Sequence, residues 1–263
     1  MTARINKPVD PLWLQQSEAE ALRTQRRRIS IVGLIGITLP ALTVLVDETF
    51  NDACFRDSLS HYYYARLSGD LFVMALAFAG AMLMAYRGET ARINRLATIA
   101  GWAALCVAFF PTIFPGCEQG AFNARAFSTV TTNLPEISGT APEFQSFPFV
   151  DYIHYAAASL LFGMMIYFCW CVFPLVSASD VNPATGKVKT IKMLRNGIYR
   201  LCAIVIALAS MGLLLYFLAG LVVEVTFWNM LNLTFWCEAV GLMAFGAAWL
   251  VKGRLFNRSF MGA

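Results

Sequence analysis

Long uncharged runs alternate with short polar connections along this chain. Residues 29–46 and 201–223, for example, contain no charged side chain. A helix that crosses a bilayer needs about 20 mostly apolar residues, and inside lipid it satisfies every backbone hydrogen bond within its own segment. The pattern therefore predicts six membrane-spanning helices. The predicted spans cover residues 29–47, 68–86, 96–115, 150–178, 198–222 and 231–251.

These spans define an all-α fold class, a polytopic membrane protein with a six-transmembrane-helix bundle in residues 29–258. Residues 1–28 are predicted to form an amphipathic arm on the cytoplasmic surface. The longer connections, 48–67 and 116–149, are expected to cap the outer side of the bundle. Hydrophobic residues make up 58% of the chain and charged residues 14%, against roughly 45–50% and about 25% in soluble domains. This composition excludes a soluble enzyme, and the net charge of +4 gives no reason to expect a nucleic-acid partner.

The basic residues predict the orientation of the bundle. Of the 20 lysines and arginines, 17 fall in the N-terminal arm, the second and fourth connections and the C-terminus. Because cytoplasmic loops carry the excess of Lys and Arg, both termini are predicted to be cytoplasmic.

Of the 16 acidic residues, 11 fall on the opposite, outer side or in the outer half of the spans, and both histidines lie near the outer surface. If the sixth helix starts near Leu231, Glu238 lies roughly 10 Å into the bilayer, at about 1.5 Å per residue. A carboxylate at that depth must point into the bundle, because facing lipid costs several kcal/mol. We therefore expect an outward-facing polar pocket. Its candidate residues are Asp57, His61, Tyr62, Asp70, Asp151, His154 and Glu238.

Two interpretations of these residues remain open. Together, His61, His154 and Glu238 could hold a divalent metal, or act as acid and base on a lipid head group. Alternatively, each residue has a local role: Asp70 caps its helix, His154 lies in interfacial water, and Glu238 bonds to a neighbouring helix. The tyrosines at 62–64 are typical of an interfacial aromatic belt, although they could also line a groove for lipid.

Two further features concern packing and covalent structure. Gly80, Gly241 and Gly246 predict close contacts between helices. Cys54 and Cys117 both fall in outer connections, where an oxidising compartment would allow them to form a disulfide.

Three stretches carry a resemblance: 57–88 (DSLSHYYYARLSGDLFVMALAFAGAMLMAYRG), 104–115 (ALCVAFFPTIFP) and 235–253 (FWCEAVGLMAFGAAWLVKG). They resemble bacterial six-span membrane proteins that are distantly similar to the Frag/DRAM/Sfk-like membrane proteins. The resemblance implies six helices, a multi-pass location in the bacterial inner (plasma) membrane and a connection with lipid. It implies no catalytic residue.

Three functions follow from these observations. The first is an inner-membrane protein whose outward pocket binds a lipid or small ligand and organises the membrane, with membrane lipids as partners. The second is a metal-assisted lipid hydrolase or transferase. The third is an accessory or scaffold subunit that contacts another membrane protein or a second copy of itself.

Overall fold

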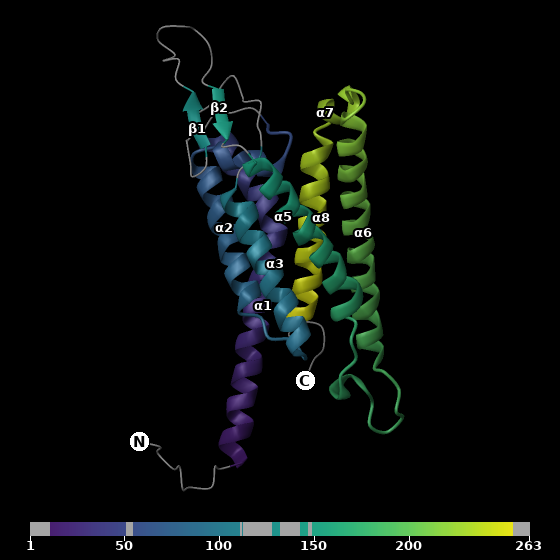
Figure 1. Cartoon of the computed structure of the whole chain (residues 1–263). Coiled ribbons are helices and arrows are strands. Elements are labelled where there is room, and N and C mark those ends of the chain that lie inside the picture. Colours follow the sequence, from purple (N-terminus) through teal and green to yellow (C-terminus); the bar gives the residue numbers. More distant parts are fainter. Residues whose placement is uncertain are drawn as a thin grey trace, which may run out of the picture.

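The computed structural model describes residues 11–50, 55–110, 112, 128–131, 143–146 and 149–254. Its helices and strands follow one another along the chain (Figure 1). They are α1 (Pro11–Phe50), η1 (Leu59–Tyr64), α2 (Leu67–Met84), α3 (Ala91–Phe109), β1 (Ser128–Thr131), β2 (Glu143–Ser146), α5 (Val150–Tyr167), η2 (Phe168–Val172), η3 (Ala178–Asp180), α6 (Thr190–Gly220), α7 (Thr226–Met230) and α8 (Leu233–Gly253). Apart from the antiparallel hairpin β1–β2, the described fold is all-α.

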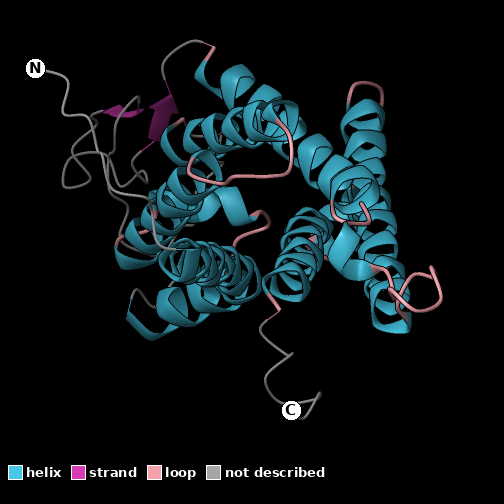
Figure 2. Ribbon diagram, turned by 90° about the horizontal axis from the view of Figure 1, so that it is seen from below, coloured by secondary structure: helices cyan, strands magenta, loops and turns pink. Residues whose placement is uncertain are grey.

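The six long helices form a closed ring. Going round it, α1 contacts α2, α2 contacts α3, α3 contacts α5, α5 contacts α6, α6 contacts α8, and α8 returns to α1. Viewed along the bundle, the helices pack side by side and the hairpin lies at the periphery (Figure 2). The first and last helices of the bundle are therefore neighbours, although they lie about two hundred residues apart in the sequence.

Five of these helices are long and apolar enough to cross a membrane: Ala19–Phe50, Leu67–Met84, Val150–Val172, Thr190–Gly220 and Leu233–Gly253. The protein is thus a polytopic integral membrane protein. The remaining predicted span corresponds to α3, which does not meet that criterion and has Arg92 and Arg95 in its first turns. The prediction of six spans is therefore supported for five, and α3 completes the ring as the sixth helix.

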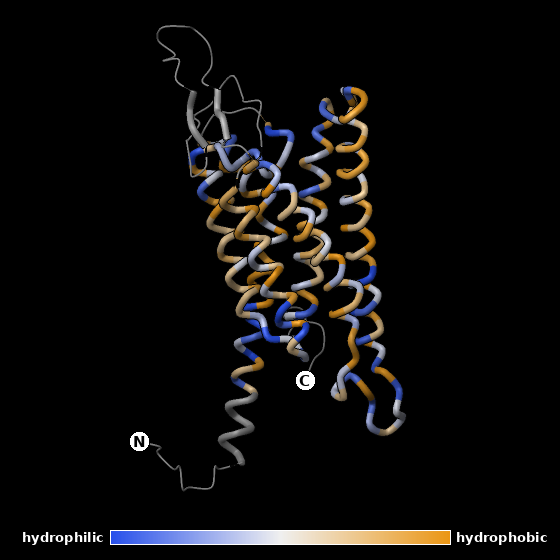
Figure 3. The backbone as a smooth tube through the Cα atoms, viewed as in Figure 1, coloured by the Kyte–Doolittle hydropathy of each residue, from blue (hydrophilic) through white to orange (hydrophobic). Residues whose placement is uncertain are grey.

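The two ends of the bundle differ in chemistry. The start of α1, the α2–α3 connection, the η3 loop and the end of α8 lie together at the lower end in Figure 1, and they carry most of the described basic residues. We call this the arginine-rich end. The opposite end holds η1, α7 and the hairpin, and we call it the η1 end. Along the helices between these ends, hydrophobic residues predominate (Figure 3).

Helix boundaries differ from the predicted spans for identifiable reasons. The helix α3 ends at Phe109, short of residue 115, because Phe110 is extended and precedes a proline. The helix α1 is continuous from Pro11 to Phe50, so the predicted arm and the first span lie on one helix. Its last turn includes Asp47, the final residue of the predicted span 29–47.

Glycines set the closest approaches between helices. A Cβ on Gly246 would lie 2.6 Å from the Gly33 carbonyl oxygen, and one on Gly101 would lie 2.6 Å from that of Gly80. A Cβ on Gly241 would lie 2.6 Å from the Phe162 ring. The predicted close contacts at Gly80, Gly241 and Gly246 are confirmed.

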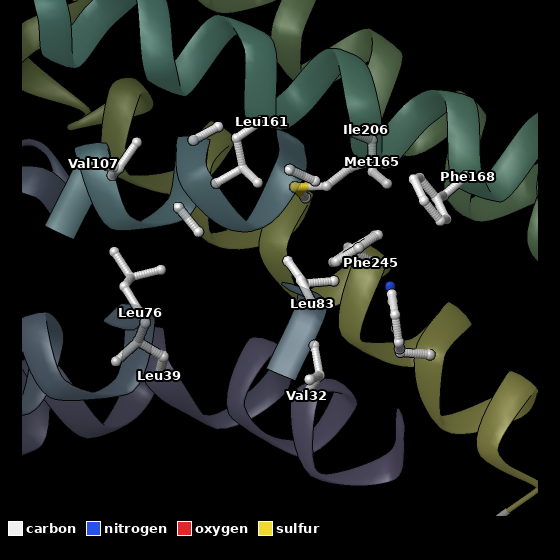
Figure 4. Close-up of a cluster of buried hydrophobic side chains, with 14 of the residues drawn as sticks. Val32, Leu39, Leu76, Leu83, Val107, Leu161, Met165, Phe168, Ile206 and Phe245 are labelled. Carbon is white, nitrogen blue, oxygen red and sulfur yellow. The ribbon is translucent and has the colours of Figure 1, made fainter. Parts of the chain in front are cut away.

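A hydrophobic core fills the ring (Figure 4). Leu39, Leu76, Leu161, Ile206 and Phe245 contribute to it from five different helices. The apolar side chains that face outward, including much of α6, are the ones that the bilayer would contact.

A candidate polar site beside η1

The carboxylate of Glu238 reaches from the second turn of α8 to the start of η1. Its Oε2 accepts hydrogen bonds from Ser58 Oγ at 2.8 Å and from the Leu59 backbone N–H at 2.7 Å. The first N–H groups of a helix have no partner within it, and they carry partial positive charge. Glu238 therefore satisfies these groups, and the partly buried carboxylate finds the donors it needs. The backbone N–H of Phe235 also donates to the Asp57 carbonyl at 2.8 Å, which holds α8 against the same segment.

His154 joins this network from α5. Its Nδ1 lies 2.6 Å from the Phe110 carbonyl oxygen, and its Nε2 lies 3.0 Å from Ser60 Oγ. Because a carbonyl only accepts, Nδ1 must carry the proton, and Nε2 then accepts from the Ser60 hydroxyl. His154 is buried, with 3% of its surface exposed. In this arrangement it is a neutral imidazole that links α5, η1 and the end of α3.

His61 pairs with Asp57 at the edge of the network. His61 Nδ1 lies 2.5 Å from Asp57 Oδ1, and the Asp57 side chain is 40% exposed. The hydrogen bond from His61 is the main reason that the pKa of Asp57 lies below its ordinary value, against the opposing effect of burial. His61 also lies close enough to Glu238 to interact with it electrostatically.

A second buried polar pair, Arg56 and Asp47, lies next to η1. Arg56 Nε donates to Asp47 Oδ2 at 3.1 Å, and Ser68 Oγ donates to Asp47 Oδ1 at 3.0 Å. Arg56 and Asp47 are 1% and 2% exposed. The sequence alone did not predict this pair, because it places Asp47 at the outer end of the first span without indicating a partner. The available signal was Arg56 itself, one of only three basic residues on the side of the chain rich in acids.

The tyrosines of η1 lie inside the protein, so the prediction of an aromatic belt is wrong. Tyr62, Tyr63 and Tyr64 are each at most 2% exposed. The hydroxyl of Tyr63 donates to the Phe109 carbonyl at 3.3 Å and that of Tyr64 to the Thr112 carbonyl at 2.8 Å, so they fasten η1 to the end of α3. Burial raises the pKa of Tyr62 to about 12, and the Arg56 guanidinium lies 5.6 Å from its ring centre.

The structure thus brings Asp57, His61, His154 and Glu238 together around η1. Two other candidates lie elsewhere at this end: Asp70 is exposed on the first turn of α2, and Asp151 is half-buried on the first turn of α5. Cys54 and Cys117 lie outside the described residues, and their disulfide stays a prediction.

The described residues include no group of three or more His, Cys, Asp or Glu side chains arranged to hold a metal ion. Two pockets of the described residues lie elsewhere, one at the arginine-rich end and one beside the α6–α7 connection. What the site offers chemically is an imidazole oriented by a carboxylate, next to a partly buried carboxylate that is fixed on backbone donors. Metal binding by His61, His154 and Glu238 stays a prediction.

Together, the ring of apolar helices and the polar site define a polytopic integral membrane protein with a hydrogen-bonded polar network at one end. Comparison with family models matches residues 144–257 to the family described as "Copper resistance protein D-like, N-terminal domain". The match spans α5 to α8, somewhat less than half of the chain, and includes His154 and Glu238. Neither the curated proteins nor the solved structures that were searched gave a match.

This match corrects the resemblance drawn from the sequence. The similarity to the Frag/DRAM/Sfk-like membrane proteins is wrong as a family assignment. The stretch Phe235–Gly253, one of the three on which it rested, falls inside the residues that match this family model. The stretch misled because small and aromatic residues around a single acid suit many packed membrane helices.

Proposed function

We propose that the protein binds and passes copper ions at the membrane, and that His61 with Asp57 forms the first point of contact. The family match over residues 144–257 supports copper as the ion, since its description names copper resistance. Asp57 and His61 lie outside the matched residues, and their assignment rests on the geometry of the site. Copper is taken here as the cargo of the protein. Imidazole nitrogen is a donor that suits copper in proteins.

The contacts of His61 support this choice of ligand. A metal-binding histidine commonly uses its second ring nitrogen on a carboxylate, which fixes the ring and raises its basicity. Asp57 holds Nδ1 of His61 in this way. The Asp57 side chain is 40% exposed, so an ion can reach this pair from the surface. His154 is 3% exposed, and both of its ring nitrogens take part in hydrogen bonds between elements of the fold. We therefore assign copper contact to His61 and a positioning role to His154.

A site with few protein ligands fits a protein that releases its ion. An ion that is passed on must be bound strongly enough to enter and weakly enough to leave. One imidazole, oriented by a carboxylate, meets this requirement better than a closed set of four ligands, which is typical of structural metal sites. The same arrangement favours binding over catalysis, because Glu238 and His154 already hold hydrogen bonds within the protein. The scaffold alternative stays a prediction.

Copper titration of purified protein in detergent, with a competing chelator as the indicator, tests the proposal. We expect binding to the wild type, and about tenfold or greater weakening in His61→Ala and Asp57→Asn. The control is Glu224→Gln, which removes an exposed acid at the same end, outside the polar network. The proposal fails if the wild type binds no copper, or if all four proteins bind it equally. Copper accumulation in cells expressing the same variants provides the functional readout.

A further inference from the structure

A pocket of about 330 Å³ opens at the arginine-rich end, far from the polar site beside η1. Three helices form it. Thr24, Gln25, Arg28 and Ile29 line it from one face of α1, the end of α2 contributes Tyr86 and Arg87 just beyond its last turn, and α8 contributes Trp249. Its volume falls in the range of small-ligand sites.

The lining combines two cations with an apolar wall. Arg28 and Arg87 are both exposed, and the residues that line this pocket include no acid. Arg87 Nη1 donates to the carbonyl oxygens of Met84 and Tyr86, which holds the guanidinium at the end of α2. Gln25 Nε2 donates to the Arg87 carbonyl and so joins α1 to the same segment. On the other side, Val32 and Met82 supply apolar surface.

The lining includes a buried donor that has no acceptor among the described residues. Trp249 is 1% exposed, and its Nε1 makes no hydrogen bond within the part of the chain that the structure describes. Its ring packs edge-on against the rings of Tyr86 and Phe173, with centroid distances of 5.4 and 5.5 Å. These contacts restrict rotation of the indole. A buried N–H without an acceptor is costly, and an acceptor supplied by a ligand removes that cost.

We propose that this pocket binds the phosphate group of an anionic membrane lipid. Guanidinium groups recognise phosphate by paired, charge-assisted hydrogen bonds, which Arg28 and Arg87 can provide from two helices. A lipid oxygen would accept from Trp249, and the apolar wall formed by Ile29, Val32 and Met82 would contact the start of the acyl chains. The lipid would then join α1, α2 and α8 at the membrane surface. This proposal is independent of the proposed copper function.

Thermal stability of the purified protein, measured with added phosphatidylglycerol, phosphatidylcholine or inorganic phosphate, provides the test. We expect phosphatidylglycerol to stabilise the wild type more than phosphatidylcholine does. In the double variant Arg28→Gln/Arg87→Gln, the apparent affinity for phosphatidylglycerol should fall at least about tenfold. Trp249→Phe, which keeps an aromatic ring and removes the donor, should weaken binding by a smaller factor. The matched control is Arg27→Gln/Arg92→Gln, which removes two exposed charges at the same end outside the pocket lining.

Each remaining outcome overturns the proposal. Equal effects of the two lipids on the wild type would remove the requirement for an anionic head group. Equal losses in the two double variants would mean that general surface charge attracts the lipid. If inorganic phosphate stabilises as much as phosphatidylglycerol, with the same dependence on Arg28 and Arg87, the pocket binds free phosphate and the lipid assignment is wrong.

Discussion

Single side chains at the η1 end connect elements that are far apart in the sequence. Glu238 binds the start of η1 across 179 residues, measured to Leu59, and His154 reaches Ser60 across 94. Glu238 Oε2 and His154 Nε2 each form a hydrogen bond with a residue of another element. The network therefore stabilises the packing of α5, α8 and η1, as well as presenting His61 and Asp57.

Two substitutions of Glu238, to Leu and to Gln, separate the loss of the hydrogen bonds from the loss of the charge. Glu238→Leu leaves the Leu59 N–H and the Ser58 hydroxyl without their acceptor, and we expect a loss of about 2–3 kcal/mol in unfolding free energy. Glu238→Gln keeps an oxygen acceptor and should lose less. Unfolding in detergent measures both, with the exposed Glu224→Leu as control. A Glu238→Leu protein as stable as the wild type would contradict a bonding role for this carboxylate.

The Asp57–His61 pair predicts a dependence of stability on acid. Because the pKa of Asp57 is lower in the folded protein than its ordinary value, its contribution to stability is present above that value. The contribution is lost as the pH falls through the folded pKa, below about 4. The side chain is 40% exposed, so solvent screening limits the effect to under about 1 kcal/mol. Thermal unfolding between pH 6 and pH 3, at roughly unit intervals, should show a smaller loss for Asp57→Asn than for the wild type. Equal losses would contradict the prediction.

At the scale of elements, the contact between α1 and α8 depends on paired glycines. Gly33 and Gly246 face each other, and a Cβ on either would lie within 2.8 Å of the other's carbonyl oxygen. Backbone carbonyls on packed helices cannot move aside as a flexible side chain can. Close approach of this kind replaces the hydrophobic effect as a source of helix association inside lipid.

Gly246→Ala tests this contact against a glycine with open space around it. We expect Gly246→Ala to destabilise the protein by about 1–3 kcal/mol, since overpacking forces the helices apart. Gly163→Ala, where a Cβ meets nothing within 4 Å, should be neutral or stabilising by up to about 1 kcal/mol through its better helix propensity. Unfolding in detergent distinguishes the two. The same effect for both substitutions would mean that helix propensity, and not the contact, controls stability.

At the scale of the whole molecule, the ring of helices separates a basic end from an end that carries the polar network. The separation follows from the alternating direction of successive long helices, which returns the α2–α3 connection, the η3 loop and the end of α8 to the same end of the bundle (Figure 1). We predict that the arginine-rich end faces the cytoplasm.

Protease sites inserted in two exposed loops test the orientation. One follows Thr185 at the arginine-rich end, and the other follows Glu224 at the η1 end. Protease added outside cells, with the outer surface made permeable where an outer membrane is present, should cleave only the protein with the site after Glu224. Permeabilising the plasma membrane should expose the site after Thr185. Cleavage after Thr185 in cells with an intact plasma membrane would reverse the assignment.

The sequence alone determined the helical class, the approximate positions of the long helices and the glycine contacts, because these depend on local composition and on the length needed to cross lipid. Leu67–Met84 and Leu233–Gly253 lie close to their predicted spans for this reason. It also indicated that Glu238 turns inward, because exposure of a carboxylate to acyl chains is too costly.

The tertiary structure decided what each polar side chain contacts. Asp47 pairs with Arg56 inside the protein, the η1 tyrosines bond to the end of α3, and Trp249 closes a pocket that α1 and α2 share. These outcomes depend on which helices are neighbours and on how each helix is rotated about its axis. Neither property is encoded in hydrophobic periodicity when almost every face of a helix is apolar, because lipid and protein interior accept the same residues.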